Sequence, residues 1–476
     1  MKNSKLIGIL KTLETKELTR FREYVHSPFF NKHKIVNKLC DYILKFAPKF
    51  DSEKLNKKNI YKVLFPNTIY NETHIYTHTS NLTLLLVDYL AVTGFQKNPL
   101  QMKLYALKAL RNKGLSKQFH QTAKQYQNLL DKRRLKDRDY HFYQAELYHE
   151  FDQINPIRNQ DQNIQLRDTE SEIVFLIDKM QIACDMINRN SIIGSNYEAS
   201  GIDFVLEWLE TDQSYYLNFP ELRINYTIYK LIKTEEKQYY DDLRLFLADK
   251  THWYSKSKIK VIYDYLTNHC IKKMNTGDKE YLREFFELHR FLLSEKILLL
   301  EDNSLDEWDY KNIVTVGARL EEFDWVKSFI YKYKNFVKSS SRENVFNYNL
   351  AYYYYSKKNY SKALGLLHHV EFTDASYYIG AKIIQLKCYY TLGELEASLS
   401  LIATFKNYIQ RSKVLSDYKK AMNQNMLRMA KKIIVLESKK IALSKKELDQ
   451  QKTKLQDQIK NLSPIANADW LVDILS

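Results

Sequence analysis

The chain of 476 residues contains only 10 glycines and 7 prolines. Average usage would place about 57 such residues in a chain of this length. Strand-rich folds need Gly, Pro, Asn or Asp at every turn, whereas stacked helix pairs need a chain-breaking residue only once or twice in about thirty residues. The scarcity of both residues excludes a strand-rich fold and predicts an all-α protein.

Cysteine and long apolar runs are scarce as well. The four cysteines are far apart and form no Cys-x-x-Cys pair, which excludes a zinc site of that type and predicts packed, reduced thiols. The longest apolar stretches, residues 82–92 and 291–300, contain charged residues and are too short for about 30 Å of hydrocarbon. An apolar stretch at residues 6–10 is too short for a secretory signal. These absences predict a cytoplasmic protein without membrane insertion.

Motifs of enzyme chemistry are missing too. The sequence has no Gly-rich phosphate loop, no Gly-x-Ser-x-Gly elbow and no His-Glu-x-x-His motif, so we predict no enzyme, no catalytic residues, no cofactor and no metal site. His74 and His78 are four residues apart, and Glu146 and His149 have the spacing that di-iron bundles use twice. Neither pair has the further ligands that a site needs. A structural role is expected for both, and a metal-dependent helical enzyme is the second alternative.

Positive charge is concentrated at the two ends of the chain. The net charge is +16, and residues 1–62 (15 basic, 6 acidic) and 411–460 (14 basic, 5 acidic) each carry a net charge of +9. Such ends are typical of proteins that bind nucleic acid or an acidic partner, although an AT-rich genome imposes the same excess of lysine. The candidate residues for RNA or DNA binding are lysines near the C-terminus: Lys431, Lys432, Lys439, Lys440, Lys445 and Lys446.

A period of 34 residues is clearest over residues 310–410. Three sets of residues recur at this spacing in the first helix of each unit: Val316, Gly317 and Leu320; Leu350, Ala351 and Tyr354; Ile384, Gln385 and Cys388. Two further sets recur in the second helix: Ala363 and Leu367; Ala397 and Leu401. Small residues where helices cross let one helix pair pack closely on the next. The period therefore predicts a solenoid of helical hairpins.

These residues resemble the tetratricopeptide repeat family over about three repeats. The Leu-Gly pair and the tyrosine of its first helix correspond to Leu350-Ala351 and Tyr354, and the small residue of its second helix to Ala363; Ala375 replaces the usual proline at the repeat end. The resemblance implies a concave surface, lined by the first helix of each pair, that binds a protein or peptide. It implies these partner-binding residues: Tyr348, Tyr352, Tyr355, Lys382, Leu386 and Tyr389.

Breaks in the pattern suggest three parts. In Ser-Pro-Phe-Phe-Asn, Pro28 is expected to end a helix, and Phe29 and Phe30 to fill the junction. A polar run at residues 155–165 predicts a boundary. We expect an N-terminal helical domain (1–154), a helical-repeat array (166–411), and long C-terminal helices with a capping tail (412–476). The Ser-Pro-Phe-Phe-Asn segment, the repeats and the final Asp-Trp-Leu also resemble a group of uncharacterised bacterial helical-repeat proteins, a likeness that implies no activity.

The C-terminal part has a separate pattern, with apolar residues spaced seven apart: Leu427, Ile434, Ile441, Leu448, Leu455 and Leu462. The second apolar seam of a coiled coil is missing, so we expect a helix lying on the array rather than a dimerising zipper. A capping box at Ser444/Glu447 predicts a break, and Trp470 with Leu471 is expected to tuck the tail back. The same S/T-x-x-E pattern predicts five other helix starts: Thr169/Glu172, Ser195/Glu198, Ser304/Glu307, Ser340/Glu343 and Thr391/Glu394.

The sequence therefore predicts an interaction scaffold that binds a protein or peptide on a concave face and performs no catalysis. The alternative is an RNA- or DNA-binding protein that uses its basic N- and C-terminal helices. The identity of the partner and the oligomeric state are left open.

Overall fold

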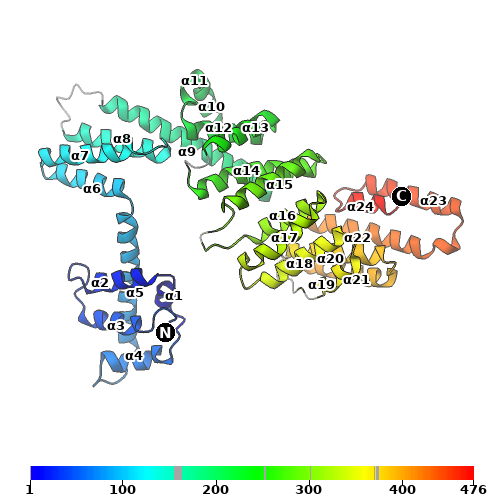
Figure 1. Cartoon of the computed structure of the whole chain (residues 1–476), viewed down its shortest axis with the longest axis horizontal. Coiled ribbons are helices and arrows are strands. Elements are labelled where there is room, and N and C mark those ends of the chain that lie inside the picture. The colour runs from blue at the N-terminus through cyan, green and yellow to red at the C-terminus, as the bar shows by residue number, and fades with distance from the viewer. Residues whose placement is uncertain are drawn as a thin grey trace. The chain divides into compact units, whose positions relative to one another are not determined.

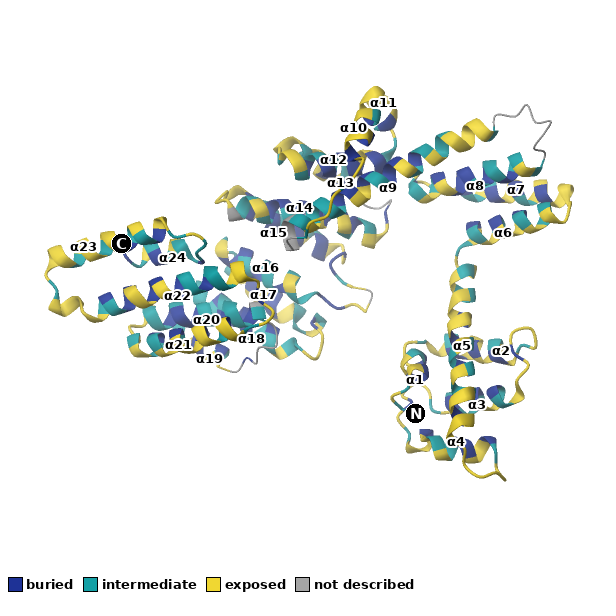
Figure 2. Cartoon of the chain, turned by 180° about the vertical axis from the view of Figure 1, so that it is seen from behind, coloured by how far each residue is buried: buried dark blue, intermediate teal, exposed yellow. Residues whose placement is uncertain are grey.

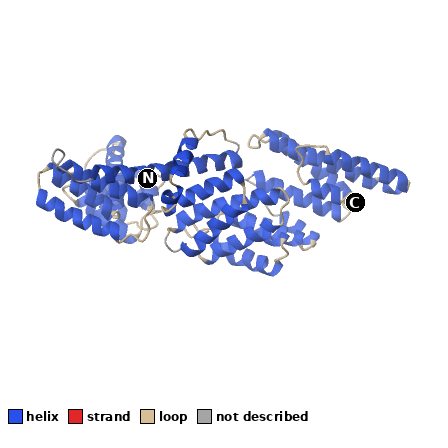
Figure 3. Cartoon of the chain, turned by 90° about the horizontal axis from the view of Figure 1, so that it is seen from above, coloured by secondary structure: helices blue, strands red, loops and turns tan. Residues whose placement is uncertain are grey.

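The computed structural model describes residues 2–154, 163–193, 195–250, 254–300, 302–368, 370 and 375–476. In these residues every regular element is a helix, and extended backbone pairs only in one bridge between Leu299 and Leu305 (Figure 3). The all-α prediction is thus confirmed for the described part of the chain. Among its helices, none combines the length and the apolar character that crossing a bilayer demands.

The described residues form two compact units. The first comprises residues 1–186 and 197–226, and the second comprises residues 187–196 and 227–476. The predicted boundary at residues 155–165 falls mostly on 155–162, which lie outside the described residues.

Helices labelled in Figure 1 have the following bounds in the first unit: α1 (Lys5–Leu10), α2 (Thr15–His26), α3 (Lys34–Leu44), α4 (Lys57–Leu64), α5 (Glu72–Gln96), α6 (Pro99–Asn112), α7 (Ser116–Asp131), α8 (Arg138–Ile154), α10 (Ile202–Thr211) and α11 (Gln213–Tyr216). Two helices contribute residues to both units: α9 (Asn163–Ile193) and α12 (Pro220–Thr234). The second unit holds α13 (Lys237–Lys250), α14 (Lys256–Asn275), α15 (Glu280–Ser294), α16 (Glu307–Arg319), α17 (Phe323–Tyr333), α18 (Arg342–Ser356), α19 (Tyr360–Leu367), α20 (Ala375–Thr391), α21 (Leu395–Arg411), α22 (Asp417–Ser438), α23 (Lys445–Lys460) and α24 (Ala468–Asp473). Three short 3₁₀ helices complete the list: η1 (Glu53–Leu55), η3 (Lys334–Phe336) and η4 (Lys440–Ala442).

In the first unit, α1 to α4 pack around one face of α5, which buries Ile75, Leu82 and Leu86. Helix α2 ends at His26, two residues before Pro28, as expected from the missing N–H of proline. The prediction for the two phenylalanines is half wrong. Phe30 stacks on Tyr24 with 4.1 Å between ring centroids, but Phe29 is 87% exposed because the turn points it into solvent.

In the second unit, helices that are consecutive in the chain pack against each other from α14 to α22. Helix α16 also contacts α18, and α18 contacts α20, so the first helices of successive pairs lie side by side. They begin at residues 307, 342 and 375, which are 35 and 33 residues apart. The described helices therefore pack in neighbouring pairs, with the spacing that the 34-residue period predicts.

Small residues permit the closest crossings. A Cβ atom on Gly317 of α16 would lie 2.6 Å from Val326 Cγ2 and 2.9 Å from a ring atom of Phe286. Ala351, one repeat later, is completely buried. A Cβ atom on Gly380 of α20 would lie 2.5 Å from the hydroxyl oxygen of Tyr348. Helices α16 and α20 thus approach their neighbours at distances that only glycine allows.

Three aromatic rings surround Lys311 and connect α16, α18 and α20. The ammonium nitrogen lies 5.1 Å from the ring centroid of Trp308, 5.3 Å from that of Tyr348 and 4.9 Å from that of Tyr377. The faces of such rings are negative and attract the cation. Because each ring comes from a different helix, the contact ties three first helices of the hairpin series together.

A second polar cluster joins α14 to α16. Lys260 lies 3.1 Å from a carboxylate oxygen of Asp264 and 3.9 Å from one of Asp309. Burial raises the pKa of Asp309 to about 6, and the nearby Asp306 and Asp264 act in the same direction, while Lys260 opposes them. The folded protein therefore holds a proton on Asp309 at pH values where the unfolded chain has lost it.

We expect the free energy of unfolding to decrease as the pH rises from about 4, the usual value of an aspartate, through about 6, because the raised pKa favours the folded state only while Asp309 is protonated. Asp309→Asn should remove this part of the pH dependence and leave a more stable protein at pH 7. Denaturant unfolding at a series of pH values measures the effect, and Asp324→Asn, at an exposed position of α17, is the control. Parallel curves for the native chain and Asp309→Asn would contradict it.

The C-terminal part is a helical hairpin. Helix α22 ends at Ser438, Ile441 is fully exposed in the turn, and α23 begins after Ser444, which forms the predicted capping box with Glu447. Of the predicted apolar stripe, Leu427, Ile434 and Leu455 are buried. The stripe therefore lines the inside of a hairpin rather than one straight helix, and the predicted break is confirmed.

The tail returns as predicted. Leu471 and Leu475 are buried in a core with residues of α20, α21 and α22, and the amide of Ala466 donates to the carbonyl of Met422 at 3.2 Å. The other predicted capping boxes are wrong or displaced. Thr169 lies inside α9, Ser195 starts no helix, and the caps near the remaining three are Asp306, Ser341 and Glu394. A four-residue pattern matches many positions whose backbone leaves no amide to cap.

The four cysteines, Cys40, Cys184, Cys270 and Cys388, are all buried and unpaired, as predicted. Burial raises the pKa of Cys40, Cys270 and Cys388 to about 12, and that of Cys184 as well. These thiols pack as small apolar side chains.

Candidate functional site

Two of the six predicted partner-binding residues belong to the core. Leu386 is completely buried and packs with Ile402 and Phe405 of the next helix. Tyr348 is 3% exposed, with its hydroxyl against Gly380. The prediction that these two side chains meet a partner is corrected, because α18 and α20 have helices on both sides, and the face assigned to a concave surface packs against a neighbour.

The other four residues, Tyr352, Tyr355, Lys382 and Tyr389, are half-buried. The rings of Tyr352 and Tyr355 lie 6.2 Å apart, and burial raises the pKa of Tyr355 to about 12. Lys382 donates to Gln385 on its own helix at 2.9 Å, and burial lowers its pKa. These side chains interact mainly with one another, which favours a packing role over a docking role.

A groove lies between α21 and α22, with a volume of about 770 Å³. On α21 the residues facing the core are spaced three or four apart, and so are those facing the groove, which include Ala403, Lys406, Asn407 and Gln410. On α22 the same periodicity buries Met426 and Ala430 and leaves the groove-facing residues at the surface. We call this hollow the basic groove. Its basic residues are Lys406, Arg428, Lys431 and Lys432.

The cations of the basic groove have almost no anionic neighbours. No acidic residue lines the groove, and within the described part of the chain none of its four cations forms an ion pair. Arg428 is oriented instead by a neutral side chain, since its guanidinium donates to Asn425 Oδ1 at 3.1 Å. Asn425 in turn donates to the carbonyl of Pro464 at 2.8 Å. The returning C-terminal segment thus helps to position a cation at the groove.

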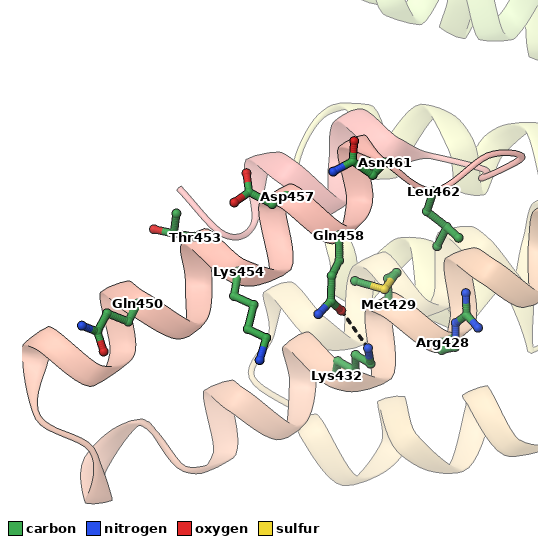
Figure 4. Close-up of a pocket in the computed structure, with 10 residues that line it drawn as sticks. All are labelled: Arg428, Met429, Lys432, Gln450, Thr453, Lys454, Asp457, Gln458, Asn461 and Leu462. Carbon is green, nitrogen blue, oxygen red and sulfur yellow. Dashed lines mark hydrogen bonds between the residues drawn. The ribbon is translucent and has the colours of Figure 1, made fainter.

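A second hollow, of about 820 Å³, adjoins the basic groove along Arg428 and Lys432 and lies between α22 and α23 (Figure 4). In Figure 4 Lys454 and Gln458 point from α23 toward α22, and Lys432 donates to Gln458 Oε1 at 2.8 Å. Asp457 points away from α22 in the same view. Figure 2 shows that α23 is largely exposed on its outer side. The cationic surface therefore continues from α21 across α22 to α23.

The six lysines predicted for nucleic-acid binding are all exposed, but the fold separates them. Lys431 and Lys432 line the basic groove. Lys439 and Lys440 lie in the turn of the C-terminal hairpin, where Lys440 pairs with Glu437 at 2.9 Å. Lys445 and Lys446, at the start of α23, line another shallow hollow. Only one of the three pairs is thus at the groove.

The expected metal candidates have ordinary packing contacts. His74 and His78 lie against the ring of Phe65, with centroid distances of 6.1 and 5.7 Å, and Glu146 accepts from Lys108 at 2.9 Å. In the residues that the structure describes, no group of three or more His, Cys, Asp or Glu side chains is placed to hold a metal ion.

Sequence reasoning missed Lys406, Arg428 and the carboxamides of the groove. Arg428, Lys431 and Lys432 are spaced three and four apart on one helix face, and this signal was available in the sequence. Lys406 lies on another helix, 25 residues before Lys431, so only the pairing of α21 with α22 brings the two together. Comparison of the chain with family models, curated proteins and solved structures found no match.

Proposed function

We propose that this protein is a non-catalytic interaction scaffold, a solenoid of helical hairpins that binds a partner protein through the basic groove. The observation that supports the proposal is the set of cations between α21 and α22 that lacks acidic neighbours. Surface charges of both signs are usually interspersed, because like charges repel and opposite charges screen them. An anionic partner would relieve the repulsion among Lys406, Arg428 and Lys431.

Nucleic-acid binding is the second candidate. The exposed lysines between residues 431 and 446 favour it, together with the net charge of +9 over residues 411–460. Binding to phosphates falls steeply with salt, because each neutralised phosphate releases counterions. Salt and nuclease sensitivity therefore separate the two functions.

Reversing two charges of the groove, Arg428→Glu with Lys431→Glu, should reduce the capture of the partner protein at least tenfold, about 1.4 kcal/mol, because attraction becomes repulsion at the centre of the site. Affinity capture from a native-cell lysate, with and without nuclease, measures it. The control is Lys327→Glu with Lys338→Glu, an equal charge change at exposed positions beyond α21–α23.

Both variants should unfold at the same temperature as the native chain, since all four positions are exposed. Capture that is unchanged by the groove variant would refute the proposal. Proteins that disappear from the captured set only after nuclease treatment would support nucleic-acid binding instead.

A further inference from the structure

We infer that the basic groove holds an extended acidic segment of a protein, in which carboxylates alternate with aliphatic side chains. This inference rests on the proposed function and names the chemistry of the partner. The arguments come from the three kinds of side chain that line the groove: cations, apolar residues and carboxamides.

The floor of the groove is apolar. Ile402 and Leu427 are buried beneath it, and Leu399 is half-buried beside them. A ligand that was purely anionic would leave this floor in contact with water. A segment that carries aliphatic side chains between its carboxylates covers the floor and presents charge to Lys406 and Lys431, which stand on opposite sides of the groove.

Carboxamides fit the backbone of such a segment. Asn407, Gln410 and Gln424 line the groove, and within the described residues none of them has a hydrogen-bond partner. Each amide group offers a carbonyl acceptor and an N–H donor side by side, which matches the donor and acceptor of a peptide unit. An extended segment exposes these backbone groups, whereas a helix satisfies them internally.

The length of the groove sets the size of the segment. Its residues on α21 run from Leu399 to Gln410, about 17 Å at 1.5 Å per residue, the span of about five extended residues. Two or three carboxylates on such a segment would face the cations, because alternate side chains point in opposite directions.

A single strand of nucleic acid fits the groove less well. Proteins bind such strands largely by stacking bases on aromatic side chains. Among the described residues that line the basic groove none is aromatic, although the chain contains 37 tyrosines and 23 phenylalanines. The groove therefore lacks the groups that would hold bases, while it has those that hold a peptide backbone.

Fluorescence anisotropy with the full chain tests the inference. The probes are a labelled peptide of about ten residues, long enough to exceed the groove, in which glutamate alternates with alanine and leucine, its counterpart with glutamine for glutamate, and an oligouridylate of similar length. We expect the acidic peptide to bind at least about tenfold more tightly than either of the others at physiological salt.

Variants locate the binding. Neutralising the groove with Lys406→Gln, Arg428→Gln and Lys431→Gln should weaken binding of the acidic peptide about tenfold, whereas Lys439→Gln, Lys445→Gln and Lys446→Gln, an equal loss of charge outside the groove, should change it less than about twofold. Replacing Asn407, Gln410 and Gln424 by leucine should weaken binding without changing its salt dependence, since no charge is removed.

Three results would overturn the inference: equal losses in the two lysine sets, equal affinity for the glutamine peptide, or tighter binding of the oligouridylate. If none of the peptides binds but capture of a lysate protein still depends on Arg428 and Lys431, the inference fails and the proposed function stands. If capture is also independent of these two residues, both fail.

Discussion

Leu386→Ala is expected to lower the free energy of unfolding by about 2–5 kcal/mol. The side chain is completely buried among Ile402, Phe405 and other residues that join α20 to α21 and α22. Its removal costs the transfer of the lost carbons and leaves a cavity between packed helices. Denaturant unfolding of the purified protein measures the loss.

The matched control is Leu392→Ala, just past the end of α20, where the leucine is largely exposed. Surface substitutions of this kind change the free energy of unfolding by about 0.5 kcal/mol or less. Nearly equal effects for the two leucines would contradict the burial of Leu386 and restore it as a candidate for partner binding.

Gly317→Ala is expected to destabilise the protein by about 1–3 kcal/mol, although the same substitution within an exposed helix is usually stabilising by about 1 kcal/mol. The new methyl group would lie 2.6 Å from Val326 and 2.9 Å from Phe286. Neither neighbour moves aside easily, because valine has a restricted rotamer and the phenylalanine ring is buried. The effect should appear as a lower midpoint of thermal or denaturant unfolding.

Gly365→Ala provides the control with the opposite sign. Gly365 is exposed on α19, and a Cβ atom there meets nothing within 4 Å. We expect a higher unfolding midpoint for this variant, because alanine loses less backbone entropy than glycine when a helix forms. If Gly317→Ala also raises the midpoint, α16 and its neighbours are not packed as closely as the structure places them.

Much of the fold follows from local rules that the sequence displays. Gly317 and Ala351 mark the crossings of successive hairpins, and the capping box at Ser444 marks the break before α23. Periodicity failed where a helix has neighbours on both sides. Tyr348 and Leu386 recur at helical spacing, but spacing alone does not tell which face meets another helix and which meets solvent.

The basic groove shows the same limit from the other direction. Arg428 and Lys431 share one helix face, a pattern that is readable in the sequence. Their pairing with Lys406 and Asn407 depends on how α21 folds against α22, and the tail acts on Arg428 through Asn425. Contacts between distant segments are set by packing of the whole unit, which no local pattern records.

The burial of the four cysteines has a chemical consequence. With pKa values of about 12, fewer than about one in ten thousand of the Cys40, Cys270 and Cys388 side chains is ionised at neutral pH, and the ionised sulfur is the form that attacks electrophiles and disulfides. The folded chain is therefore nearly inert toward alkylating reagents and oxidants. A single cysteine introduced at an exposed position such as Lys406 would react alone, so a spectroscopic label there reports on that position without removal of the native sulfurs.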